Sequence, residues 1–157
     1  MIKDTGNRTP YETGAVRDMK EGKGRMDLLP LETLLDIRVE ETPVTVRNTI
    51  LSIKMFMATG NKKHLIQAVK ESRLYPNPWT AWLELAKHFE EGAKKYGERN
   101  WEKGIPVQSY IDSGLRHYVK YLRGDVDEPH DRAFLWNLVC AIWTCTYHDE
   151  LNGYGGD

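Results

Sequence analysis

Four polar side chains recur along one stretch of the chain at helical spacing. Glu84, His88, Glu91 and Lys95 lie four, three and four residues apart. On a helix these side chains fall within about 60° of one another, opposite an apolar face. Carboxylates arranged in this way can present oxygen ligands to Mg²⁺, which leaves positions for substrate phosphates. An ordinary solvated surface with i,i+4 ion pairs is the alternative, and it stays open.

A second group of acids opens the last long run of apolar residues. Asp125 and Asp127 are followed by Glu128 and Asp131, and the last two are spaced to share one helix face. Carboxylates this close repel one another unless a cation lies among them. The group therefore indicates a metal site, although an acidic helix start that complements the helix dipole would need no metal.

Basic side chains that could bind phosphate occur in three parts of the chain. Arginine offers phosphate a planar fork, and lysine offers a compact point charge. The three groups are Lys95, Arg99 and Lys103; Arg116, His117, Lys120 and Arg123; and, near the start, Arg17, Lys20, Lys23 and Arg25. Gly14, Gly22 and Gly24 would let the backbone near the start approach a ligand closely. There is no Walker A pattern, so P-loop chemistry is not indicated.

Amide and aromatic side chains could recognise a base. His130 lies on a different stripe of the last apolar run, together with Asn137. A buried imidazole or amide needs hydrogen-bond partners, and a base or phosphate would supply them. Trp101 or Trp136 could stack on the base, while Asn100 or Asn137 could bind its edge. Acids, basic groups and aromatic residues together point to a metal-bound nucleotide.

The apolar pattern that must position these residues predicts helices and no strand. The predicted helices cover about 28–35, two segments within 43–73, 79–96, 107–122 and 128–150. Within the helix 79–96, the predicted buried face includes Trp82, Leu85 and Phe89. Residues 1–26 are rich in Gly, Lys and Arg and predict an extended or irregular arm. The expected fold is all-α, with short loops.

Composition favours a small single-domain protein. The chain has 157 residues, 40% hydrophobic, with a formal net charge of −1. This charge excludes a general nucleic-acid binder that depends on counterion release. Cys140 and Cys145 are expected to be thiols in the core. The start has no signal-peptide pattern, and the apolar run 133–143 is too short to span a membrane, so a cytoplasmic location is expected.

Several blocks of sequence together resemble the phage dATP/dGTP diphosphohydrolase family. They are 12–18 and 22–30 in the arm, 92–104, 112–117, and 127–137. The family is related to MazG-like all-α nucleoside triphosphate pyrophosphohydrolases, so the resemblance implies a MazG-like helical bundle. In some phages that replace adenine with 2-aminoadenine, members supply dGMP and remove competing dNTPs. If the chain is phage-encoded, the cytoplasm is that of the host.

The resemblance implies hydrolysis of dGTP, dATP or both to the monophosphate and pyrophosphate, with Mg²⁺ or Mn²⁺. The predicted metal ligands are Glu84, Glu91, Glu128 and Asp131. Glu91 would orient or deprotonate the water, and Lys95 would stabilise phosphate charge. The predicted substrate-binding residues are Lys23, Arg25, His88, Arg99, Asn100, Trp101, Arg116, His117, His130 and Asn137. A homodimer or homotetramer is expected.

The chain departs from the family pattern in two places. Residues of about 37–77 resemble an inserted helical hairpin within the single domain. The Glu-Glu-x-x-Glu part of the MazG-like pattern has Lys94 where a third glutamate would follow Glu90 and Glu91. The Glu-x-x-Asp part is present as Glu128 to Asp131. A nucleotide sensor without turnover, or a helical interaction module, therefore remains an alternative.

Overall fold

Residues 6–156, which the computed structural model describes, form six α-helices and one short β-hairpin. The first five residues of the predicted arm and residue 157 lie outside this range. The helices are α1 (Leu31–Ile37), α2 (Val44–Thr59), α3 (Lys63–Ser72), α4 (Pro78–Tyr96), α5 (Val107–Arg123) and α6 (His130–Tyr147). Short 3₁₀ turns lie at Met26–Leu28, Val39–Glu41, Asn100–Lys103 and Asp149–Leu151. The predicted all-α fold is confirmed.

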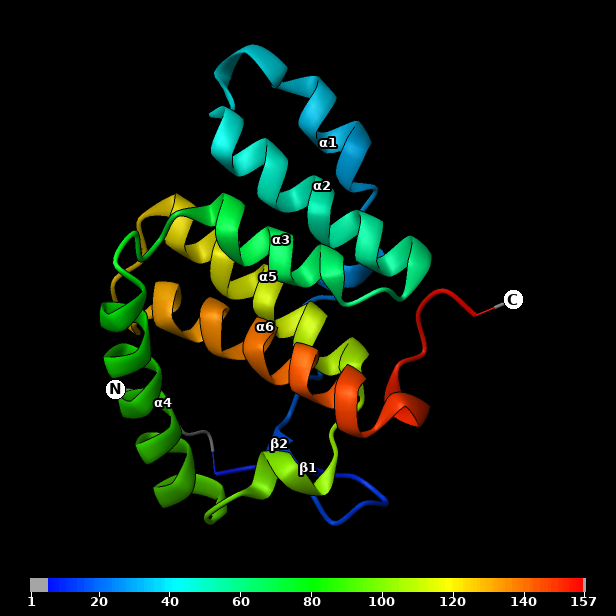
Figure 1. The fold of residues 1–157 in the computed structure, drawn as a ribbon, viewed down its shortest axis with the longest axis vertical. Helices are drawn as coiled ribbons and strands as arrows, with labels where there is room; N and C mark the ends of the chain where they lie inside the picture. Colours follow the sequence, from blue (N-terminus) through cyan, green and yellow to red (C-terminus); the bar gives the residue numbers. More distant parts are fainter. Residues whose placement is uncertain (1–5, 157) are drawn as a thin grey trace.

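The helices α5 and α6 form the centre of the fold and lie side by side (Figure 1). Tyr118 and Phe134 are buried between them, with ring centroids 4.6 Å apart. Burying such a side chain contributes roughly 1.5–3 kcal/mol. Gly114 keeps the helices close, because a Cβ there would lie 3.1 Å from Leu138 Cδ1. Within residues 6–156, no helix is both long and apolar enough to cross a membrane.

The two helices predicted between residues 43 and 73 are present as the α2–α3 hairpin. It covers one side of the α5–α6 pair (Figure 1) and buries Ile53, Phe56 and Leu65. Gly60 ends α2 with a φ of 68°, in the left-handed region that glycine adopts without strain. A Cβ at this position would overlap the carbonyl oxygen of Tyr154, so the C-terminal segment also requires glycine here.

Helix α4 crosses the start of α6 (Figure 1), and the face it turns inward differs from the prediction. Asn77 caps the helix by accepting a hydrogen bond from the backbone N–H of Trp79, and Gly97 ends it. Trp82, predicted to be buried, is 68% exposed, whereas His88 is 6% exposed. Phe89, predicted to be buried, packs against Trp136 on α6, so the correction to the predicted apolar face concerns Trp82. Glu84, His88 and Glu91 of the polar stripe face α6, which corrects the solvated-surface alternative. The cause is Arg132 on α6, a buried cation that requires polar partners.

The N-terminal arm contains a β-hairpin that the sequence analysis did not predict. Strand β1 (Arg8–Pro10) pairs antiparallel with β2 (Val16–Asp18), with Thr9 opposite Arg17. Strands of this length are too short to show an alternating pattern of apolar residues. The hairpin is held to the helical body because the Asn100 side chain hydrogen-bonds both the N–H and the carbonyl of Val16, each at 2.9 Å.

Candidate active site

A pocket of about 850 Å³ lies between α4, the arm hairpin, α5 and the first half of α6. This volume falls within the usual range for small-molecule sites. Its charged lining residues are Arg17, Asp18, Lys20, Lys23, Glu90, Glu98, Arg99, Arg116, Lys120, Asp127 and Glu128. Both signs of charge are present, but Arg17, Lys20, Lys23, Arg116 and Lys120 form one group, here called the basic wall.

Three side chains, Phe89, Trp101 and Trp136, form an aromatic wall of the same pocket. The Phe89 ring centroid lies 5.2 Å from that of Trp101 and 5.9 Å from that of Trp136. The indole Nε1 of Trp136 is buried and has no hydrogen-bond partner within residues 6–156. The Phe89 ring plane is inclined by 56° to that of Trp101 and by 61° to that of Trp136. The wall therefore combines several apolar ring faces with one unused donor, which suits a heteroaromatic ring that carries an acceptor.

Arg17, on β2, joins the basic wall to the aromatic wall. Its Nη2 donates to Asn137 Oδ1 at 3.1 Å, and its Cζ lies 5.1 Å from the Tyr110 ring centroid and 5.7 Å from that of Trp136. Its Nη1 is buried without a hydrogen-bond partner in the described part of the chain. A half-buried guanidinium whose Nη1 donor is buried and unused, on a pocket wall, is suited to an anionic ligand.

Arg116 anchors the glycine-rich part of the arm. It forms a buried ion pair with Asp112 at 2.7 Å and donates to the carbonyls of Lys23, at 3.3 Å, and Gly24, at 2.5 Å. Asp112 also accepts a hydrogen bond from the backbone N–H of Met26 at 2.6 Å. The predicted phosphate ligand Arg116 thus holds the loop that carries Lys23 and also lines the pocket.

The predicted catalytic residues Glu91 and Lys95 form ion pairs with neighbouring elements. Arg132 on α6 binds Glu91 at 2.9 Å and approaches Glu84 at 3.9 Å. Lys95 pairs with Asp18 of the arm at 2.8 Å, and its side chain is 7% exposed. None of Glu84, Glu91 and Lys95 lines the pocket. Glu91 and Lys95 therefore help to hold α4 against α6 and the arm hairpin.

The four carboxylates predicted to bind metal are not brought together. Glu84 and Glu91 face Arg132, and Asp131 accepts a hydrogen bond from the Tyr75 hydroxyl at 2.8 Å. Glu128 is the member of this set that lines the pocket. Within residues 6–156, no potential metal-binding cluster contains Glu84, Glu91 or Asp131. Arg132 explains why these carboxylates do not form a metal site. Its positive charge lies beside Glu84 and Glu91, where the prediction placed a metal ion.

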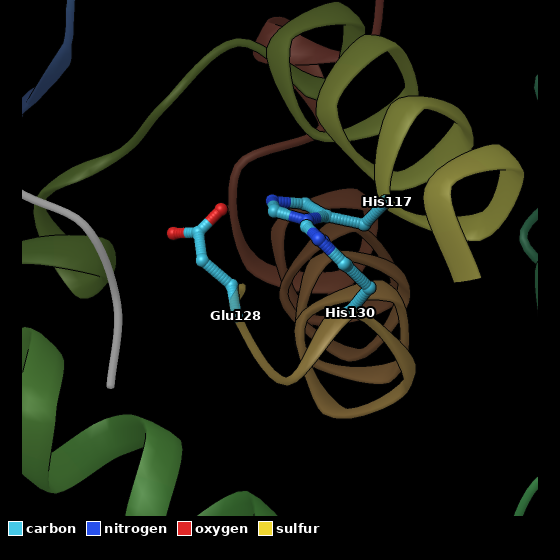
Figure 2. A group of neighbouring side chains, drawn as sticks. All are labelled: His117, Glu128 and His130. Carbon is cyan, nitrogen blue, oxygen red and sulfur yellow. The ribbon is translucent and has the colours of Figure 1, made fainter. Parts of the chain in front are cut away.

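Two histidines instead meet beside Glu128 at the edge of the pocket (Figure 2). His117 Nδ1 lies 2.9 Å from His130 Nδ1, and His130 Nε2 lies 2.8 Å from Asp127 Oδ1. The predicted substrate-binding residue His130 is 2% exposed. Burial lowers the pKa of His117 to about 3, with further contributions from His130 and Arg17, so this ring is neutral at neutral pH.

The other predicted substrate-binding residues divide into those on the pocket wall and those away from it. Lys23, His88, Arg99, Asn100, Trp101, Arg116, His117 and Asn137 line the pocket. Arg25 and His130 are not among its lining residues. Arg25 pairs with Asp27 at 2.8 Å. Asn100 uses its amide to hold the arm, as described above, and exposed Arg99 pairs with Glu102 at 2.6 Å.

Comparison with known proteins identifies the family. Residues 57–152 match the family model described as dATP/dGTP diphosphohydrolase, N-terminal. This range is more than half of the chain. The chain belongs to this family. No curated protein and no solved structure matches it.

In this member of the diphosphohydrolase family, the matched range supplies the aromatic wall and both histidines of the pocket edge. Arg17, Lys20 and Lys23 precede the matched range. Sequence analysis noted these three as basic residues of the arm but did not select Arg17 or Lys20 for the site. No local signal identifies Arg17, because its position depends on the hairpin docking against α6. The i,i+3 spacing of Asp127 and His130 is a signal that could have identified that pair.

Proposed function

We propose that this protein hydrolyses purine deoxynucleoside triphosphates, dGTP, dATP or both, to the monophosphate and pyrophosphate. Membership of the dATP/dGTP diphosphohydrolase family supports the substrate class. The structural observation that carries the proposal is the buried, unpartnered Nη1 of Arg17 on the wall of a pocket of nucleotide size. Leaving such a donor without a partner is unfavourable, and a phosphate oxygen would satisfy it with a charge-assisted hydrogen bond.

The aromatic wall is the proposed site for the base. Stacking of a base on an aromatic side chain contributes roughly 1–3 kcal/mol. The unused Nε1 donor of Trp136 would bind an acceptor on the base edge. Guanine offers N7 and O6 as acceptors and adenine offers N7, so both purines fit this donor.

The basic wall is the proposed site for the triphosphate. Lys20, Lys23 and Lys120 line the pocket on the side of the arm and α5. Lys20 is held in place by a hydrogen bond of 2.9 Å from its Nζ to Ser109 Oγ. Arg17, between the two walls, would bind the phosphate nearest the sugar and stabilise the negative charge that develops there during hydrolysis.

A requirement for Mg²⁺ or Mn²⁺ belongs to the proposal, but the four carboxylates predicted to bind it do not fit. A bound divalent cation neutralises phosphate charge and lowers the pKa of an attacking water. Glu84 and Glu91 are paired with Arg132, and Asp131 is bound to Tyr75. No reaction step is therefore assigned to a metal held by this set.

The test is to incubate the purified protein with each of the four dNTPs and a divalent cation, and to separate the products by anion exchange. We expect pyrophosphate and the monophosphate from a purine dNTP. The Arg17→Gln variant should lower kcat/KM by roughly 10–100-fold, the value of a hydrogen bond to a charged group. Arg38→Gln is the matched control, because Arg38 is 72% exposed and pairs only at the surface with Glu41.

Release of orthophosphate, or of intact triphosphate with the nucleoside, would contradict the proposed reaction. Equal turnover by the Arg17→Gln variant and the wild type would contradict the proposed role of Arg17. A monophosphate product from pyrimidine dNTPs alone would contradict the purine assignment.

A nucleotide sensor without turnover is a second candidate. It is favoured by the ion pairs of Glu91 and Lys95, since neither of these predicted catalytic groups lines the pocket. In that case, a purine dNTP would raise the melting temperature and titrate in calorimetry, while no product would form in the assay above.

A further inference from the structure

Two imidazoles and a carboxylate converge at the edge of the pocket (Figure 2). Potential ligand atoms of His117, Glu128 and His130 all lie within 4.8 Å of one another. The Nδ1 atoms of the two histidines are 2.9 Å apart. Imidazole nitrogens that share one metal ion, each about 2.1 Å from it, are about 3.0–3.4 Å apart, so the observed spacing needs only a small adjustment.

Asp127 fixes which nitrogen of His130 is available. An ionised carboxylate only accepts hydrogen bonds, so the contact of 2.8 Å to Asp127 Oδ1 requires the proton on His130 Nε2. An imidazole that binds a metal ion is neutral, so with the proton on Nε2 its Nδ1 carries the lone pair. In the metal-free protein this lone pair accepts the hydrogen bond from His117 Nδ1, and a bound ion would take the place of that proton. A carboxylate behind a ligating imidazole is the arrangement that orients histidine ligands in many metal sites.

The donor set differs from the one that Mg²⁺ prefers. Mg²⁺ favours oxygen ligands, whereas two imidazole nitrogens with one carboxylate suit first-row transition metals. We propose that His117, Glu128 and His130 form a binding site for a divalent transition-metal ion, with Asp127 as the positioning residue for His130. The site takes such an ion in preference to Mg²⁺.

The surroundings connect this site to the pocket. His117, Asp127 and Glu128 all line the pocket, so an ion held there would face a bound ligand. Arg17 and Lys120 are nearby cations whose charges act on His117. Metal binding itself does not depend on the proposed hydrolysis; only a role of the ion beside the phosphates rests on that function.

The test measures metal binding without nucleotide. Protein stripped with EDTA and dialysed is titrated with Zn²⁺, Co²⁺, Mn²⁺ and Mg²⁺ in a calorimeter, and the Co²⁺ complex is examined by visible absorption. We expect one site per chain, with Zn²⁺ and Co²⁺ bound at least about 100-fold more tightly than Mg²⁺. Co²⁺ should show the visible bands of a site with nitrogen ligands.

Substitutions test which residues bind the metal ion. Glu128→Gln and His117→Gln should abolish the Co²⁺ bands, and Asp127→Asn should weaken binding by roughly 10–100-fold. His64→Gln is the control, because His64 lies on α3, outside the pocket lining. Circular dichroism in EDTA establishes that each variant is folded. If Glu128→Gln is folded and keeps the bands, or if Mg²⁺ binds as tightly as Zn²⁺, the proposal is overturned.

Failure of this site and failure of the proposed function give different results. Metal binding that is lost in the variants, without any dNTP turnover, keeps the site and rejects the function. Turnover by wild type and His117→Gln alike, with no transition-metal binding in calorimetry, rejects the site and keeps the function.

Discussion

His88 should make the protein sensitive to mild acid. Its side chain is buried, and its Nδ1 accepts a hydrogen bond from Arg132 Nε at 3.3 Å. Burial and, to a smaller extent, the neighbouring Arg132 lower the pKa of His88 to about 3. The folded protein therefore keeps this imidazole neutral, whereas in the unfolded chain it has a pKa of about 6.5.

The size of the effect follows from these two pKa values. As the pH falls below about 6.5, the unfolded chain binds a proton at His88 that the folded protein does not, so stability falls. Well above pH 6.5, His88 causes no loss of stability. Below it, the free energy of unfolding falls by up to about 1.4 kcal/mol per pH unit until the folded pKa of about 3 is reached. Between pH 7.5 and 5.0 the loss from His88 is about 2 kcal/mol.

The assay is urea unfolding of the wild type and His88→Asn at several pH values. Asparagine keeps an acceptor near the position of Nδ1 but does not titrate. Its absolute stability is lower because the side chain is smaller, so the measured quantity is the pH dependence. The wild type should lose about 2 kcal/mol more than the variant between pH 7.5 and 5.0. Parallel losses in the two proteins would show that His88 takes up a proton in the folded state and would refute the reasoning.

Three further substitutions test the site and the fold. Trp136→Phe keeps a ring but removes the unpartnered Nε1 donor, so KM for the purine dNTP should rise by roughly 5–10-fold under conditions in which urea unfolding shows the variant to be folded. Gly60→Ala should lower the free energy of unfolding by more than about 1 kcal/mol, because of its positive φ and the close Tyr154 carbonyl. Asn100→Ala removes both hydrogen bonds to Val16 and should speed amide exchange in β2, measured by mass spectrometry, without unfolding the helices.

Each of these predictions has a matched control or a contrary result. A Trp136→Phe variant with unchanged KM would place the base elsewhere. Gly92→Ala is the control for Gly60, since Gly92 lies within α4 with open space around it, and alanine there should stabilise the helix. If exchange in β2 is unchanged in the Asn100→Ala variant, this side chain does not hold the arm.

Local sequence signals were sufficient for the helices. The predicted helix 79–96 agrees with α4, Pro78–Tyr96, to within one residue, because helix ends depend on residues a few positions apart. Helix periodicity also showed that α4 has two chemically different faces. It could not show which face turns inward, because that depends on Arg132, more than thirty residues further along the chain.

The site was less predictable for the same reason. The region of the pocket was anticipated through Trp101, His117 and Glu128, but the partners of these residues come from other elements. The predicted metal set assumed that acids on α4 and α6 would face each other, and a single buried arginine between them reverses the local charge. Arg17 reaches the pocket only through a hairpin whose strands are three residues long.

In the proposed function, recognition of the nucleotide is divided between two stretches of chain. The aromatic wall belongs to the helical body, whereas Arg17, Lys20 and Lys23 come from a segment held by the Asn100 and Arg116 hydrogen bonds. A version of the chain that began at residue 57 would present half of a binding site, able to contact a flat ring but without much of the positive charge. If the proposed function holds, selectivity for the base and affinity for the phosphates can change independently, by substitutions in separate segments.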